Sequence, residues 1–340
     1  MFLMSISEMG TGIYRIIDKH GPRGEIQGIY MIVGDQIGLI DTGSPSPRFA
    51  MKILEAIKSY GHNANQVSHI FLTHEHPHHI GGSHEFAKIF PQAVFVIHNE
   101  GSAALLDPVR TLLSNNFLLG KMQRVKLTLG TDAFSKMKGI DEDLIQLVSG
   151  DEKFDLGGKT ILLRATQGHS AAHVFYYCVE NRAMFTGDEV QIYPENPYSY
   201  YFDATGDVQK REQALKLLLK AKIDVFAPAH DSVFIGPDFK DIIRLALESQ
   251  HHVEDLILDT LIDGALPTET IQKQIDSSLG LNWGEPYRSL IDAHTARAHL
   301  KRLTQDESVT LIEKKRKKGQ LVEYWQLTSD RSAEDSEYAF

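Results

Sequence analysis

The chain has 340 residues, and its 45 acidic and 35 basic side chains give a formal net charge of −10, which favours neither nucleic acid nor an anionic membrane as a partner. Its single cysteine, Cys178, excludes an intrachain disulfide and a cysteine zinc cluster. A hydrophobic fraction of 42% suits a soluble globular core, and no stretch approaches the roughly 18 apolar residues of a membrane span, so a cytoplasmic protein is the default expectation.

Runs rich in β-branched and aromatic residues, separated by Gly, Pro or Asp, predict strands in the first hundred residues. These predicted strands cover residues 12–18, 25–34, 36–43, 67–74 and 93–98. Apolar residues at helical spacing predict helices over 48–61 and 83–90. The segment 99–140 is predicted to be an irregular helical insertion, which we expect either to cap a site or to mediate contacts in a homodimer.

The same scheme of strands followed by a helix repeats further along the chain. Strands are predicted over 154–166, 172–180, 182–188 and 223–230, and a helix over 208–221. This order indicates an α+β fold over residues 1–236, in which two mixed sheets pack on each other with helices outside.

The chain changes character after Pro237. A long helix is predicted as far as Leu261, another helix over 288–304, and two β-prone arms over 309–327. Helices followed by such a hairpin predict a small helical, winged-helix-like C-terminal module over residues 237–328. The polar, acidic residues 329–340 are predicted to be a disordered tail.

Four histidines gather within six residues where the strand 67–74 ends: His74, His76, His78 and His79. A lone histidine is usually a core or surface residue, whereas a cluster at a strand end is typical of a metal site. In an extended chain His74 and His76 point to the same side and can bind one ion. His78 and His79 follow Pro77, where a second ion is within reach.

Further metal-ligand residue types end three later strands: His169, Asp188 and His230. Each comes after an apolar strand and a small residue, a position that delivers side chains to one rim of a sheet sandwich. Four strand ends of this kind predict that the side chains converge on one metal site.

The motifs HEHPHH at 74–79, GHSAAH at 168–173, TGD at 186–188 and PAH at 228–230, preceded by LIDTG at 39–43, resemble those of the metallo-β-lactamase superfamily. The resemblance covers about residues 10–235 and implies an αββα sandwich that binds one or two metal ions. Zinc is the expected metal, and iron or manganese are alternatives. The implied ligands are His74, His76 and His169 for the first ion, His79 and His230 for the second, and Asp188 as the bridge. Asp41 is implied to orient the ligand loop, and His173 to lie beside the ligands or the substrate.

His78 departs from the usual family pattern H-x-H-x-D-H, in which the aspartate binds the second metal and can shuttle a proton. An imidazole can still bind a metal, but it removes one negative charge from the site. We expect His78 to be a ligand of the second ion and a catalytic residue, together with Asp188 and His173. Alternatively, His78 turns away from the cluster, and the second metal site then binds its ion weakly.

The resemblance implies a metal-dependent hydrolase in which a metal-bound hydroxide cleaves a small ester or thioester, such as an acyl-coenzyme A or a glutathione conjugate. One alternative is an endoribonuclease on single-stranded RNA, suggested by the C-terminal module and the basic run 314–318. Another is a non-hydrolytic di-iron or ligand-binding relative, although redox relatives usually replace His76 with glutamate. Four tyrosines are expected either to line the pocket mouth or to pack on their own protein: Tyr193, Tyr198, Tyr200 and Tyr201.

Overall fold

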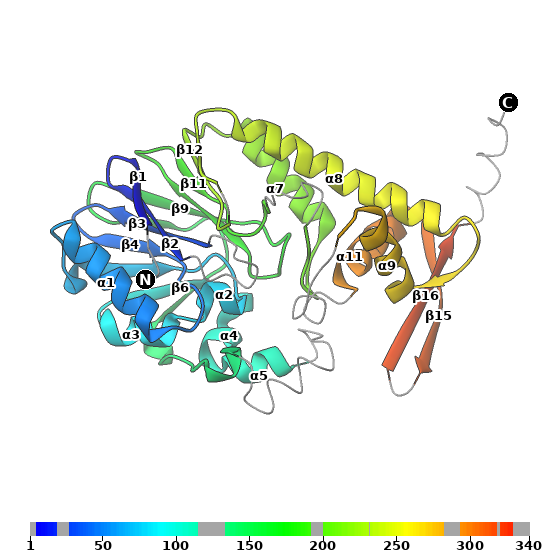
Figure 1. The fold of residues 1–340 in the computed structure, drawn as a ribbon, viewed down its shortest axis with the longest axis horizontal. Helices are drawn as coiled ribbons and strands as arrows, with labels where there is room; N and C mark the ends of the chain where they lie inside the picture. The colour runs from blue at the N-terminus through cyan, green and yellow to red at the C-terminus, as the bar shows by residue number, and fades with distance from the viewer. Residues whose placement is uncertain are drawn as a thin grey trace.

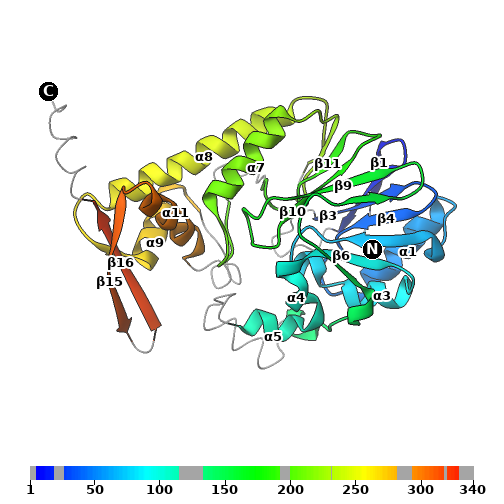
Figure 2. The ribbon, with the colours of Figure 1, turned by 180° about the vertical axis from the view of Figure 1, so that it is seen from behind.

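The computed structural model describes residues 5–18, 27–114, 133–191, 200–230, 232–281, 293–317 and 320–328. Within these residues two mixed β-sheets pack face to face with helices on their outer sides, and a smaller helical part lies beyond one end (Figure 1). The view from behind shows the same layers and the same separation of the smaller part (Figure 2). In the described part of the chain, no helix combines the length and the apolar character needed to cross a membrane.

The first sheet has the order β1-β2-β3-β4-β5-β6-β7. Its strands are β1 Ser5–Gly10, β2 Ile13–Asp18, β3 Gln27–Val33, β4 Ile37–Ile40, β5 Val67–Phe71, β6 Val94–His98 and β7 Ile145–Val148. Strands β1 to β4 pair antiparallel, whereas β4 to β7 pair parallel. The parallel strands end at one edge of the sheet, so the residues that follow β5 are delivered to that edge.

The second sheet has the order β13-β12-β11-β10-β9-β8. Its strands are β8 Lys153–Asp155, β9 Thr160–Ala165, β10 Val174–Cys178, β11 Ala183–Phe185, β12 Val225–Ala227 and β13 Phe234–Ile235. Strands β9 and β11 both pair antiparallel with β10, and β12 pairs parallel with β11. Therefore β9, β11 and β12 run in one direction and end at the same edge.

The described helices are α1 Pro47–Ser59, α2 Pro77–Ile80, α3 Ser83–Ile89, α4 Ser102–Leu106, α5 Pro108–Leu113, α7 Val208–Lys220, α8 Phe239–Thr260, α9 Thr268–Ser278 and α11 His294–Gln305. A third sheet, ordered β14-β16-β15, consists of β14 Leu266–Pro267, β15 Val309–Lys317 and β16 Gln320–Leu327. Helix α1 begins where sequence rules predict, because the Ser46 side chain accepts a hydrogen bond from the Phe49 N–H and Pro47 occupies the first turn.

Buried apolar residues form separate layers that match the sandwich. Phe71 and Tyr176 belong to the layer between the two sheets, and α1 and α3 cover the outer side of the first sheet. Helix α8 contributes to two further layers. Its first half packs on the second sheet through Phe239 and Ile243, and its second half packs on α9 and α11 through Ile257.

The predicted α+β sandwich is confirmed, while several element predictions were incomplete. The segment 154–166 forms two strands rather than one, because Gly157 and Gly158 turn with positive φ between β8 and β9. Strands β1 and β7 were not predicted, since both are short and lack a long β-branched run. Helix α9 was not predicted. Its buried face has two apolar residues, Ile271 and Ile275, and the others on that face are polar, so the helical pattern is weak in the sequence.

The predicted hairpin near the C-terminus is present as β15 and β16. Its likeness to a winged helix and the boundary at residue 237 stay predictions. Several expectations concern residues outside the described ranges: the centre of the insertion, 115–132, the tail 329–340, Tyr193, Tyr198 and Lys318.

Candidate metal centre

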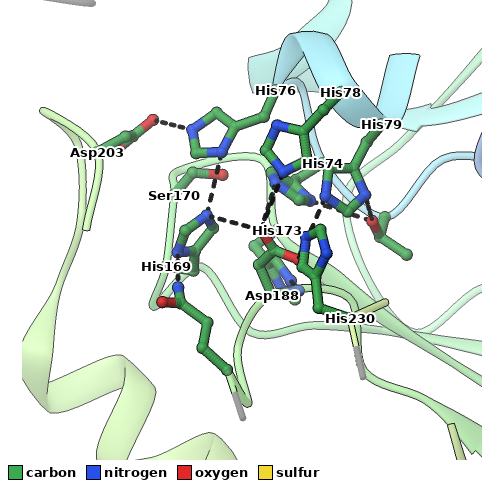
Figure 3. A network of polar contacts seen from close by, with 12 residues as sticks. His74, His76, His78, His79, His169, Ser170, His173, Asp188, Asp203 and His230 are labelled. Carbon is green, nitrogen blue, oxygen red and sulfur yellow. Dashed lines mark hydrogen bonds and ion pairs between the residues drawn. The ribbon is translucent and has the colours of Figure 1, made fainter. Parts of the chain in front are cut away.

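The predicted ligand residues meet at the shared edge of the two sheets (Figure 3). His74 and His76 lie between the end of β5 and the start of α2, and His78 and His79 are in α2 itself. His169 follows β9, Asp188 follows β11 and His230 follows β12. All seven therefore reach one point because their strands end at the same edge.

One group of possible metal donors consists of His74, His76, His169 and Asp188, and their donor atoms all lie within 4.8 Å of one another. Asp188 Oδ2 is 3.8 Å from both His74 Nε2 and His169 Nε2. His76 Nδ1 lies 3.1 Å from His169 Nε2. All four residues are buried.

A second group shares two residues with the first and consists of His74, His78, His79 and Asp188. His78 Nε2 lies 3.3 Å from Asp188 Oδ2, so the side chain points into the cluster rather than away from it. His79 Nε2 and His230 Nε2 each lie 3.2 Å from Asp188 Oδ1. The Asp188 carboxylate thus belongs to both groups, and both of its oxygens face imidazole nitrogens.

Neighbouring polar groups orient two imidazoles of the first group. Asp203 Oδ2 lies 3.4 Å from His76 Nε2, and the Tyr201 carbonyl oxygen lies 3.1 Å from His169 Nδ1. Because a carboxylate only accepts, His76 Nε2 carries the proton, which leaves His76 Nδ1 unprotonated on the inner side as a metal ligand requires. His169 Nδ1 lies between the Tyr201 carbonyl oxygen and the Gln191 amide nitrogen, 3.0 Å from the latter, so His169 presents Nε2 to the inner side.

Asp41 orients a histidine of the second group in the same way. Its Oδ2 lies 2.8 Å from His79 Nδ1, so this nitrogen donates and Nε2 is the nitrogen that faces the centre. The Thr73 hydroxyl donates to the same carboxylate, and His74 Nδ1 lies 3.1 Å from Thr73 Oγ1. Since the hydroxyl proton is already donated, His74 Nδ1 must be the donor in that pair, which directs Nε2 inward.

Burial keeps most of the imidazoles neutral. It lowers the pKa values of His74 and His169 well below their ordinary value and lowers the pKa of His78 to about 3. A neutral imidazole is the form that binds a metal ion, so these histidines need not lose a proton first.

His79 and Asp188 carry the charges of the cluster. Burial lowers the pKa of His79, but the carboxylates of Asp188 and Asp41 outweigh it and raise that pKa to about 10. Burial also raises the pKa of Asp188, yet His79 and His230 outweigh it and hold that pKa well below its usual range. The ionised Asp188 carboxylate therefore faces the centre and favours a cation there, and a metal ion bound by His79 Nε2 would displace a proton from that nitrogen.

The arrangement and chemistry of these residues fit a divalent metal ion. Among the described residues, His74 Nε2, His79 Nε2 and Asp188 Oδ1 are buried polar atoms without a hydrogen-bond partner. Each such atom costs about 1–3 kcal/mol if it stays unsatisfied. Imidazole nitrogens combined with a carboxylate are a donor set that divalent transition metals prefer. The cluster can therefore hold metal ions of this class.

His173 lies behind the ligands rather than among them. Its Nε2 accepts the Asp188 backbone N–H at 3.1 Å, and its Nδ1 lies 3.1 Å from Glu189 Oε2. Glu189 also accepts from the Thr166 hydroxyl. Burial lowers the pKa of His173 to about 3, so the ring is neutral and holds the Asp188 backbone in place.

Sequence reasoning did not identify Asp203, Thr73 or Gln191 as part of the site. Gln191 binds both the N–H and the carbonyl oxygen of Tyr201, which places that carbonyl against His169. No motif marks these residues, and Asp203 reaches His76 only through the fold. Tyr200 was considered for the pocket mouth, but its side chain is buried on the opposite side, while the Tyr201 ring lies against His76 and His169.

The sequence matches the family model of the metallo-β-lactamase superfamily over residues 26–230, and the chain belongs to that superfamily. The fold agrees with a solved metallo-β-lactamase family protein from Thermus thermophilus. That structure superposes with a TM-score of 0.68 at 18% identity, over 94% of this chain and 100% of the other.

Several curated relatives carry functional names, among them a thioesterase and a glyoxylase. An atrochrysone carboxyl ACP thioesterase from Aspergillus fumigatus is 23% identical over 318 residues, which are 89% of this chain and 63% of the relative. Glyoxylase B2 from Dictyostelium discoideum is 28% identical over 148 residues, 44% of this chain and 43% of the relative. This chain thus spans less than two thirds of either protein.

Proposed function

We propose that the protein is a metal-dependent hydrolase, with zinc as its expected metal, that cleaves a small thioester. One observation carries the proposal: histidine nitrogens from both sheets surround Asp188, and the outer ring nitrogens of His79, His76 and His169 face Asp41, Asp203 and Tyr201. The names of the two curated relatives, a thioesterase and a glyoxylase, support hydrolysis and favour a thioester.

In this proposal His74, His76, His169 and Asp188 hold one ion, and His78, His79 and His230 hold a second with Asp188. A divalent metal ion held there would lower the pKa of a water beside it to about 7 and would polarise a neighbouring carbonyl oxygen. Asp188 Oδ2, between the two groups, offers an acceptor that orients the attacking water. Water and thioester are converted to a carboxylate, a thiol and a proton.

The chain's own nucleophilic thiol has no part in this proposal. Cys178 is buried in the layer between the sheets, and burial raises the pKa of its thiol. This side chain therefore provides no thiolate at the centre, and His78 enters the proposal as a ligand of the second ion. Its side chain is 16% exposed, whereas that of Asp188 is fully buried, so His78 is on the solvent side of the cluster.

The test combines metal content with a substrate panel. Protein purified without chelator or added metal is measured by inductively coupled plasma mass spectrometry, with His78→Ala in parallel. Close to two equivalents in the wild type and one in His78→Ala supports His78 as a ligand. Equal content in both proteins contradicts that role.

The metal-loaded protein is then assayed on an acyl-coenzyme A, an S-acylglutathione, a carboxylic ester and labelled single-stranded RNA. Thioester turnover that falls at least about 10²-fold in His169→Ala, as loss of a metal ligand predicts, supports the proposal. His251→Ala is the matched control, since its side chain is 61% exposed on α8. RNA cleavage lost in His169→Ala, or an absorption band that responds to oxygen, would instead support a nuclease or a di-iron protein.

A further inference from the structure

Residues Tyr200–Asp203 connect the metal centre to the C-terminal module. Tyr200 and Phe202 are 4% and 0% exposed and belong to the apolar layer that contains Ile257 of α8. Tyr201 and Asp203 instead contact the site histidines. Neighbouring side chains thus point to opposite sides, as in an extended chain.

On the module side, Tyr200 is held by three helices. Its hydroxyl lies 2.7 Å from His299 Nε2 in α11, and His299 Nδ1 lies 3.4 Å from Glu254 Oε1 in α8. The Arg211 guanidinium of α7 lies over the Tyr200 ring, 4.4 Å from its centroid. Because these contacts enclose the Tyr200 ring, the ring is held in a single position.

On the site side, Asp203 is fixed through both carboxylate oxygens. Its Oδ1 accepts from the Thr205 backbone N–H and hydroxyl, each at 2.7 Å, while Oδ2 faces His76 Nε2. The Asp203 N–H donates to the His169 carbonyl oxygen at 3.2 Å, and the Tyr201 carbonyl faces the His169 ring. One short segment therefore orients two of the three histidines of the first group, His76 and His169.

We propose that the Tyr200–Asp203 segment is a positioning element through which the C-terminal module sets the orientation of His76 and His169 at the first metal ion. The inference rests on the proposed metal site. Because two residues of the segment are packed in the module and the residues next to them hold the ligands, a shift of Tyr200 or Phe202 displaces both imidazoles. Metal affinity at the first site therefore depends on packing in the module.

The test uses cobalt(II), whose visible absorption reports ligand geometry, and competition with a chromophoric chelator to measure affinity. In Asp203→Ala, the dissociation constant of the first equivalent should rise about 10- to 100-fold, as for other groups that orient a metal ligand. Asp224→Ala is the matched control, because Asp224 is an exposed carboxylate paired with Arg182. The control should bind cobalt like the wild type.

Tyr200→Phe tests the link to the module, since it removes only the hydroxyl that faces His299. We expect a changed cobalt spectrum and a smaller rise in the dissociation constant, about two- to fivefold, as for the loss of one neutral hydrogen bond. Tyr177→Phe is the control, because the Tyr177 hydroxyl donates to the Lys222 carbonyl oxygen at 2.8 Å, away from the site.

The outcomes separate this inference from the proposed function. A wild-type protein that binds no cobalt would contradict the metal site itself. Wild-type binding with an unchanged constant and spectrum in Tyr200→Phe would overturn the coupling to the module, even if Asp203→Ala is impaired. Changes in Tyr200→Phe that are absent in Tyr177→Phe would support it.

Discussion

In the half of the metal centre built on His79, the outward ring nitrogen is held by Asp41, a residue of the sandwich itself. In the half built on His76, the outward nitrogen is held by Asp203, whose neighbours are packed in the C-terminal module. The two halves share Asp188 but have separate supports. A perturbation can therefore be directed at one half, at the other, or at both.

Replacing the shared residue should have the largest effect. Asp188→Asn keeps the side-chain size but removes the charge that faces both groups, which is worth several kcal/mol, or on the order of 10²-fold or more in activity. We expect metal content to fall in both halves and thioester turnover to be lost. Elemental analysis and the thioester assay measure this, and two retained equivalents would show that Asp188 does not bridge.

Asp41→Asn should weaken the half built on His79 more than the half built on His76, because Asp41 contacts His79 directly and reaches His74 through Thr73. Asn tolerates the positive φ of 64° at this position, so the backbone is expected to stay unchanged. With the carboxylate lost, His79 is held less firmly, and the second equivalent should bind about 10- to 100-fold more weakly. Cobalt titration measures both equivalents. Equal weakening of the two would contradict the separate supports, and Asp203→Ala is the complementary variant.

The smallest expected effect is a pH dependence of the module's contact with the Tyr200–Asp203 segment. Burial lowers the pKa of His299 below the ordinary value of 6.5, although Glu254 opposes it. As pH falls below 6.5 the unfolded chain binds a proton that the folded protein does not, so this contribution to stability is present above that pH and lost below it.

We therefore expect the free energy of unfolding to fall less steeply between pH 6.5 and 5 in His299→Gln than in the wild type. Thermal or urea denaturation of both proteins over this range, in the presence of a chelator, measures the difference. Parallel curves would show that His299 does not titrate on unfolding. The contrasting half, supported by Asp41, is unchanged in this variant.

The sequence was sufficient to predict the convergence of the inner residues, because each ends an apolar strand and a sheet edge gathers strand ends. His74, His169 and Asp188 all lie where this rule places them. The residues that orient the ligands, Asp41 and Asp203, were less predictable. Asp41 lies in a motif of the resembling family, whereas Asp203 is 127 residues from His76 and has no motif of its own. Its role depends on how Tyr200 and Phe202 pack, which is a tertiary contact without local periodicity.

Helix α8 has a mechanical consequence for substrate access. Its 22 residues extend about 33 Å and contain neither proline nor glycine, the residues at which helices most often kink. Since Ile243 is packed on the sandwich and Ile257 on the module, the helix connects the two parts rigidly. Hinge opening between the two parts would have to break this helix, so the module should keep its position on the sandwich while a substrate enters and leaves.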